Sequence, residues 1–152
     1  MKLKFTLNFS FIVCLMFGYA TMFAQAPNTL TITSPASIAA EYSIGSAAFG
    51  GMIADGEMAR IQLLNDNDDS DADTTQDPGG NTADGCNGTI NDLTGSWAFM
   101  DRGDCQFGTK ALAAEAAGAV GVIICNWEAN GAALVGMPAG DDGAAVTIPV
   151  TS

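Results

Sequence analysis

The sequence contains no histidine, and this absence excludes several kinds of active site at once. Hydrolases that use a Ser-His-Asp triad or a Cys-His pair need an imidazole to accept a proton. The common zinc sites that use imidazole nitrogen as a ligand are excluded for the same reason. The sequence therefore excludes most of the familiar catalytic arrangements.

Basic residues are also scarce. Beyond residue 26 only Arg60, Arg102 and Lys110 are basic, and all 17 acidic residues lie there too, so this part carries a net charge of −14. Nucleic acids and anionic membranes are bound through clusters of Lys and Arg. The sequence excludes both as partners of the exported chain.

Residues 1–26 have the layout of a secretory signal peptide. Lys2 and Lys4 precede an apolar run at 9–23, and small residues follow, with a cut after Ala24 favoured. An uncleaved membrane anchor is the alternative, but the run is interrupted by serine, glycine and threonine. We expect a protein that is secreted or displayed at the cell surface. Residues 27–152 have the length of one domain.

Three cysteines remain after the signal peptide. Cys86 and Cys105 lie in polar, glycine-rich surroundings, whereas Cys125 ends the apolar run 120–124. Because disulfides persist in oxidising compartments, we expect a disulfide between Cys86 and Cys105. Cys125 is predicted to be a small buried side chain. A nucleophilic role for Cys125 is the alternative, but it has no histidine to activate it and only acidic neighbours.

Hydrophobic periodicity predicts alternating strands and one helix. The expected strands are 29–33, 58–64, 97–100, 120–126 and 145–150, with an irregular stretch at 39–56 and an acidic surface loop at 65–84. A helix is expected over 106–117, capped by Asp104 and ended by Gly118. Apolar residues recur at 107, 111, 114 and 117 on one face of this helix, and Lys110 falls between these positions. The flanking strands should be parallel.

The acidic loop suggests a calcium site. Its carboxylates recur at nearly alternate positions, as in oxygen-liganded calcium loops: Asp66, Asp68, Asp69, Asp71 and Asp73. The match to an EF-hand is incomplete, because Thr74 and Gly80 replace its glycine and its bidentate glutamate. A solvated loop that keeps a secreted domain soluble is the alternative.

Paired carboxylates at Asp101 and Asp104, or at Asp141 and Asp142, could be imagined as an acid/base couple. No apolar pocket is evident around either pair to separate their pKa values. We favour an ion pair between Arg102 and a neighbouring carboxylate.

The run from Gly85-Cys86 through Trp97-Ala98-Phe99-Met100-Asp101-Arg102-Gly103-Asp104-Cys105-Gln106-Phe107 to Ala117-Gly118-Ala119-Val120-Gly121-Val122-Ile123-Ile124-Cys125-Asn126 closely resembles the protease-associated (PA) domain family. The resemblance spans roughly 29–152 and includes the later Ile148-Pro149. Structural motif positions carried over from the family are Gly95, Asp101, Arg102, Gly103, Phe107, Lys110, Gly118, Asn126 and Pro149.

The resemblance implies an α/β fold: a β-rich sheet, forming an open barrel or sandwich, with one or two packed helices. It also implies a non-catalytic module that binds a protein or peptide partner, or gates substrate access to an attached peptidase domain. Family members continue past the Ile-Pro strand, so the domain is expected to be cut short at its C-terminal end. A calcium-binding surface or adhesion module is the alternative function.

Overall fold

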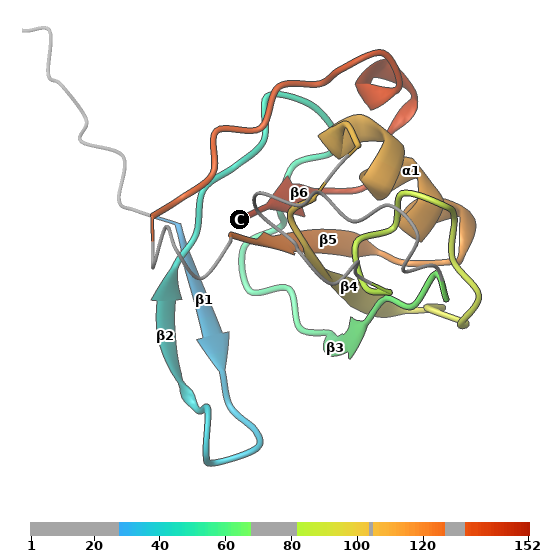
Figure 1. Ribbon diagram of the computed structural model, residues 1–152. Coiled ribbons are helices and arrows are strands. Elements are labelled where there is room, and N and C mark those ends of the chain that lie inside the picture. The colour runs from blue at the N-terminus through green and yellow to red at the C-terminus, as the bar shows by residue number, and fades with distance from the viewer. Residues whose placement is uncertain (1–27, 68–81, 104, 127–132) are drawn as a thin grey trace, which may run out of the picture.

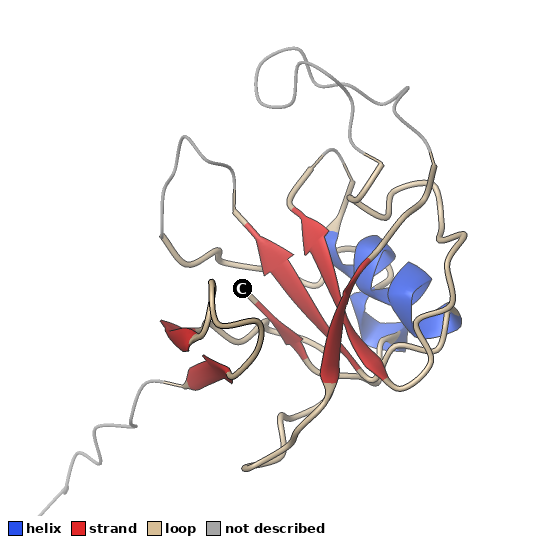
Figure 2. Cartoon of the chain, turned by 90° about the horizontal axis from the view of Figure 1, so that it is seen from below, coloured by secondary structure: helices blue, strands red, loops and turns tan. Residues whose placement is uncertain are grey.

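The computed structural model describes residues 28–67, 82–103, 105–126 and 133–152 (Figures 1 and 2). The expected signal peptide at 1–26 lies outside these residues. The elements in chain order are β1 (Thr29–Ile32), β2 (Ala40–Ser43), β3 (Arg60–Leu63), β4 (Ser96–Asp101), α1 (Phe107–Ala116), β5 (Gly121–Cys125), the 3-10 helix η4 (Gly143–Ala145) and β6 (Val150–Thr151). Among them, no helix is long and apolar enough to cross a bilayer.

The main sheet has four parallel strands in the order β3-β4-β5-β6. Strands β4 and β5 pair from Trp97 opposite Gly121 to Asp101 opposite Cys125. The connection between them contains α1, which lies against one face of the sheet (Figure 2). The predicted α/β class and the parallel strand-helix-strand unit are confirmed.

Small residues bring α1 close to its neighbours. Ala111 and Ala114 are fully buried in one core with Met100, Val122 and Ile124. On another side, a Cβ added at Gly108 would lie 2.3 Å from the carbonyl oxygen of Ala139. The helix can therefore sit directly on the backbone that leads into η4.

Both ends of α1 lie within one residue of the predicted bounds, but the residue predicted to cap its start is not the N-cap. Gly118 has φ +90°, and its N–H donates to the carbonyl of Glu115 while that of Ala119 reaches Ala114, which forms a Schellman cap. The N-cap residue is Gln106, and its side chain makes no capping hydrogen bond. The predicted cap, Asp104, lies outside the described residues.

Strands β1 and β2 form a separate antiparallel hairpin that extends away from the main sheet (Figure 1). The sequence predicted irregular structure at 39–56 and so missed β2. All four residues of β2 are exposed, so no alternation of buried and exposed side chains marks the strand. Only its pairing with β1 defines it.

The strand expected at 145–150 is wrong for most of its length. Residues 143–145 form η4, and β6 begins only at Val150. Val146 is buried in the core without belonging to a strand, and Pro149 has no N–H to give to a ladder. The apolar pattern here reflects burial of a loop, which hydrophobicity alone does not distinguish from a strand.

Candidate functional site

Among the described residues, most of the sequence-predicted site residues lie near the carboxyl ends of the strands of the main sheet. Because β3, β4 and β5 are parallel, their carboxyl ends point the same way (Figure 2). The acidic loop follows β3, the turn beginning at Arg102 follows β4, and Asn126 follows β5. The strand order in the main sheet is sequential. The carboxyl ends of the strands therefore lack the reversal of strand order at which open α/β sheets form a ligand crevice.

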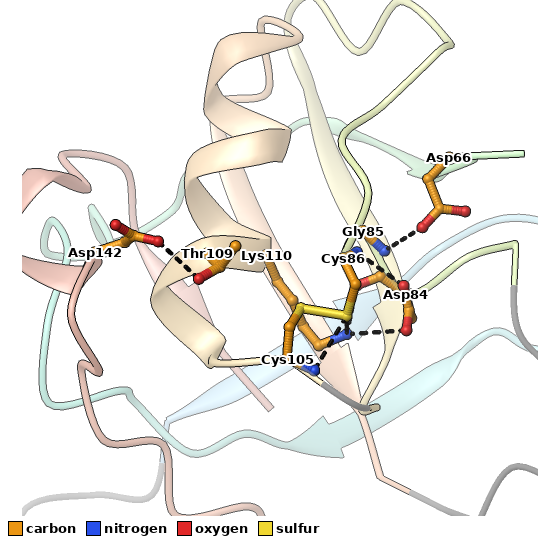
Figure 3. The surroundings of a disulfide bond; sticks show 8 residues. All are labelled: Asp66, Asp84, Gly85, Cys86, Cys105, Thr109, Lys110 and Asp142. Atoms are coloured by element: carbon orange, nitrogen blue, oxygen red, sulfur yellow. Dashed lines mark hydrogen bonds and ion pairs between the residues drawn. A yellow bond between two sulfur atoms is a disulfide. The ribbon is translucent and has the colours of Figure 1, made fainter. Parts of the chain in front are cut away.

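The expected disulfide between Cys86 and Cys105 is present in the structure, with Cα atoms 5.6 Å apart (Figure 3). Cys86 belongs to the segment before β4, and Cys105 precedes the first turn of α1. The bond therefore ties the end of the acidic region to the start of the helix.

Lys110 extends from α1 into the interior beside this disulfide and is fully buried (Figure 3). Its ammonium donates to the backbone carbonyl of Asp84 at 2.6 Å and to the Sγ of Cys86 at 3.2 Å. The Asp84 carboxylate, also buried, lies 3.5 Å away as an ion pair. The helical pattern of apolar residues did not predict that Lys110 points into the interior. Sequence analysis missed Asp84 because an aspartate in an acidic loop is predicted to be exposed.

Two aspartates organise the backbone around Lys110. One carboxylate oxygen of Asp84 accepts from the N–H of Cys86 at 2.8 Å. Asp66, buried at 6% exposure, accepts from the N–H of Gly85 at 3.0 Å. A Cβ at Gly103 would lie 2.9 Å from an Asp84 oxygen, so this motif glycine makes room for the carboxylate. These contacts fix the returning end of the acidic loop.

The calcium hypothesis is not decided by these contacts. Of its proposed ligands, Asp66 uses one carboxylate oxygen on Gly85, and the others, Asp68, Asp69, Asp71 and Asp73, lie outside the described residues. Calcium binding stays a prediction.

Arg102 bridges the turn after β4 to neighbouring segments. Its guanidinium donates to the side-chain carbonyl of Asn126 at 3.3 Å and lies 5.9 Å from the ring centroid of Phe107. Asn126 in turn donates to the carbonyl of Ala133 at 2.9 Å. The ion pair favoured for Arg102 from the sequence stays a prediction, since Asp104 lies outside the described residues.

The remaining motif positions shape the backbone. Gly95 has φ +69°, in the turn before β4. Pro149 accepts a hydrogen bond from the N–H of Val122 at 2.9 Å and so extends the pairing between β5 and β6. The backbone N–H of Asp101 donates to the carbonyl of Ala83 at 3.0 Å.

Cys125 is a free thiol, partly exposed rather than buried as predicted. Burial raises the pKa of this thiol above its ordinary value, and the nearby Asp101 carboxylate raises it further. A raised pKa leaves less thiolate at neutral pH, which disfavours Cys125 as a nucleophile.

The described residues form open grooves on the surface. One, of about 400 Å³, is lined by Cys105, Gln106, Phe107, Pro138 and Gly140. Another, of about 410 Å³, is lined mainly by residues 46–53, with Asn28 and Val150. In the part of the chain that the structure describes, no three His, Cys, Asp or Glu side chains converge as a metal site.

A profile of the PA domain family matches residues 60–152, more than half of the chain. The chain belongs to the PA domain family. The match begins where β3 begins, so the β1–β2 hairpin lies ahead of it. The resemblance read from the sequence reached further back, to Thr29.

A comparison with solved structures finds the chain similar to BSAP, a zinc aminopeptidase from Bacillus subtilis. The identity is 22% and the TM-score 0.49, over 75% of this chain and 23% of the aminopeptidase chain. This PA domain chain thus spans less than a quarter of that relative. No curated protein matches it.

Proposed function

We propose that this chain is an extracellular, non-catalytic PA domain that binds a protein partner or gates substrate access beside a peptidase catalytic domain. Membership of the PA domain family carries the proposal. The predicted signal peptide and the disulfide support an extracellular location.

The contacts of Lys110, Asp84 and Arg102 also support a non-catalytic role. Lys110 and Asp84 are fully buried and contact each other and the disulfide. Arg102 contacts Asn126 and the Phe107 ring. Side chains held in this way position backbone, whereas a general acid or base must reach a substrate atom.

The surface offers adaptable contacts to a partner. Met52 and Met58, on the segment leading into β3, are 93% and 89% exposed. Met52 also lines the groove beside β6. Exposed methionines are flexible and polarizable, and surfaces that accept varied protein partners use them often. We place partner contact on this segment.

The first experiment tests attachment to a peptidase. The coding sequence beyond Ser152 is read in the source genome. An in-frame peptidase domain supports the proposal, whereas adhesion repeats in that position contradict the peptidase part of it. The purified chain should also release no peptides from casein, and turnover abolished by one point mutation would contradict the non-catalytic part.

The second experiment uses that peptidase with this domain in place. Met52→Ser combined with Met58→Ser should change kcat/KM for a protein substrate while leaving turnover of a small chromogenic amide unaltered. Ile90→Ser is the matched control, because Ile90 is 65% exposed and lies away from the methionines. Its backbone N–H donates to the carbonyl of Asn65, which follows the carboxyl end of β3, whereas the methionines precede β3. Equal effects of both changes would contradict partner contact at the methionines.

A further inference from the structure

The two sulfur atoms of the Cys86–Cys105 disulfide have different surroundings. The Sγ of Cys86 accepts two hydrogen bonds, from the Lys110 ammonium at 3.2 Å and from the backbone N–H of Cys105 at 3.2 Å (Figure 3). Lys110 itself is fully buried. The sulfur of Cys86 therefore has two hydrogen-bond donors, one of them an ammonium that also pairs with the Asp84 carboxylate at 3.5 Å, although Cys86 itself is partly exposed.

Cys105 instead lines an open groove. The groove of about 400 Å³ is bordered by Gln106, Phe107, Pro138 and Gly140, and Cys86 is not among its lining residues. The groove is large enough for the thiol end of a small molecule to approach Cys105. Both cysteines are partly exposed, but only Cys105 borders this groove, whereas the sulfur of Cys86 is held against an ammonium.

This asymmetry matters for thiol–disulfide exchange. An attacking thiolate displaces one sulfur of a disulfide, and exchange is faster when the leaving sulfur is stabilised as a thiolate. Hydrogen bonds to an ionised acceptor are stronger than those to a neutral one. The two hydrogen-bond donors at Cys86 therefore stabilise the thiolate form of Cys86 more strongly than they stabilise the neutral sulfur of the intact disulfide.

We infer that Cys105 is a site of reversible modification by small thiols, with Cys86 as the leaving sulfur. A thiolate RS⁻ attacks the Sγ of Cys105, the Cys86–Cys105 bond breaks, and the bonding electron pair leaves on Cys86. The products are RS–S–Cys105 and a Cys86 thiolate beside Lys110. Attack by this thiolate on Cys105 expels RS⁻ and restores the disulfide, so no other oxidant or reductant is needed.

The exchange would release one structural tie. With the disulfide open, the segment carrying Asp84 and the start of α1 are joined by the Lys110 contacts but no longer by a covalent bond. Modification at Cys105 would thus loosen the returning end of the acidic loop while Lys110 keeps the sulfur of Cys86 in place to close the bond again.

The test maps the modified sulfur. The purified oxidised chain, with Cys125→Ser to remove the free thiol outside the disulfide, reacts briefly with reduced glutathione and is quenched with acid. Mass spectrometry then locates glutathione. We expect attachment at Cys105 to exceed attachment at Cys86 by about tenfold during the initial phase. Attachment at Cys86, an even distribution, or a reaction that begins only in denaturant would overturn the proposal.

The role of Lys110 is tested separately. Lys110→Met should slow exchange by about tenfold and reduce the preference for Cys105, because the Cys86 thiolate loses its charged donor. Thr109→Ala is the matched control: Thr109 is the adjacent residue of α1, and its hydroxyl donates to Asp142 at 2.7 Å rather than to a sulfur. A folded Lys110→Met variant with the original rate and preference would overturn the role of Lys110. If this variant does not fold, the site mapping on the unchanged lysine decides the proposal.

Discussion

The ammonium of Lys110 and the carboxylate of Asp84 lie 3.5 Å apart, and both side chains are fully buried. The lysine also reaches the backbone carbonyl of Asp84 at 2.6 Å. One helix residue therefore holds both the charge and the backbone of a residue that lies 26 positions earlier in the chain.

Lys110→Met should lower the free energy of unfolding by about 3–5 kcal/mol, because it leaves the Asp84 carboxylate buried without its cation. Urea denaturation measures the change. Arg60→Met is the matched control, since it removes an exposed positive charge and should cost less than about 0.5 kcal/mol. Equal stability of the two variants would show that the buried ion pair contributes nothing.

Gly108→Ala should destabilise the protein, although alanine usually favours a helix over glycine. The added Cβ would lie 2.3 Å from the carbonyl oxygen of Ala139 and 2.4 Å from the backbone nitrogen of Gly143. Both are backbone atoms, so α1 must move away, at a cost of about 1–3 kcal/mol. Thermal unfolding checks this. Gly136→Ala, which meets no atom within 4 Å, should be nearly neutral, and a stabilised Gly108→Ala variant would refute the close approach.

Asn91 protects the free edge of β3. Its side-chain amide donates to the carbonyl of Leu63 and accepts from the N–H of Asn65, both at 2.9 Å. Unpaired edge groups promote association with other chains. Asn91→Ala should therefore increase self-association in sedimentation velocity and cost about 1 kcal/mol. Asn87→Ala, at an exposed asparagine, is the control and should self-associate no more than the unmodified chain.

The reactivity of Cys125 should depend on pH through its raised pKa. Iodoacetamide reacts with the thiolate, so alkylation of the folded chain should be slow near pH 8 and reach half its maximum at a pH above that of an unfolded cysteine. Asp101→Asn should shift this midpoint downward, because it removes a negative charge near the thiol. Asp55→Asn, at an exposed turn, should leave the midpoint unchanged.

The same shift has a defined effect on stability. The folded state holds the Cys125 proton more tightly than the unfolded state does. The protonated thiol therefore contributes to the free energy of unfolding in full below the ordinary thiol pKa. This contribution is lost as the pH rises through the raised pKa of Cys125 in the folded state. Stability that increased over this alkaline range in wild type relative to Cys125→Ser would contradict the raised pKa.

The sequence by itself determined the strand-helix-strand unit. Short apolar runs bounded by turn residues marked β4 and β5, and Gly118 marked the end of α1, because each signal depends on local backbone preference and burial. The disulfide partners could also be chosen, since compartment and local composition separated Cys86 and Cys105 from Cys125.

Only the tertiary structure decided the inward position of Lys110 and the burial of Asp84 and Asp66. A charged residue is normally exposed, so periodicity assigns these side chains to the surface. They become buried because segments distant in the chain supply compensating donors and acceptors: Lys110 for Asp84, and the N–H of Gly85 for Asp66. That compensation is a property of packing between segments, and no local pattern of residues encodes it.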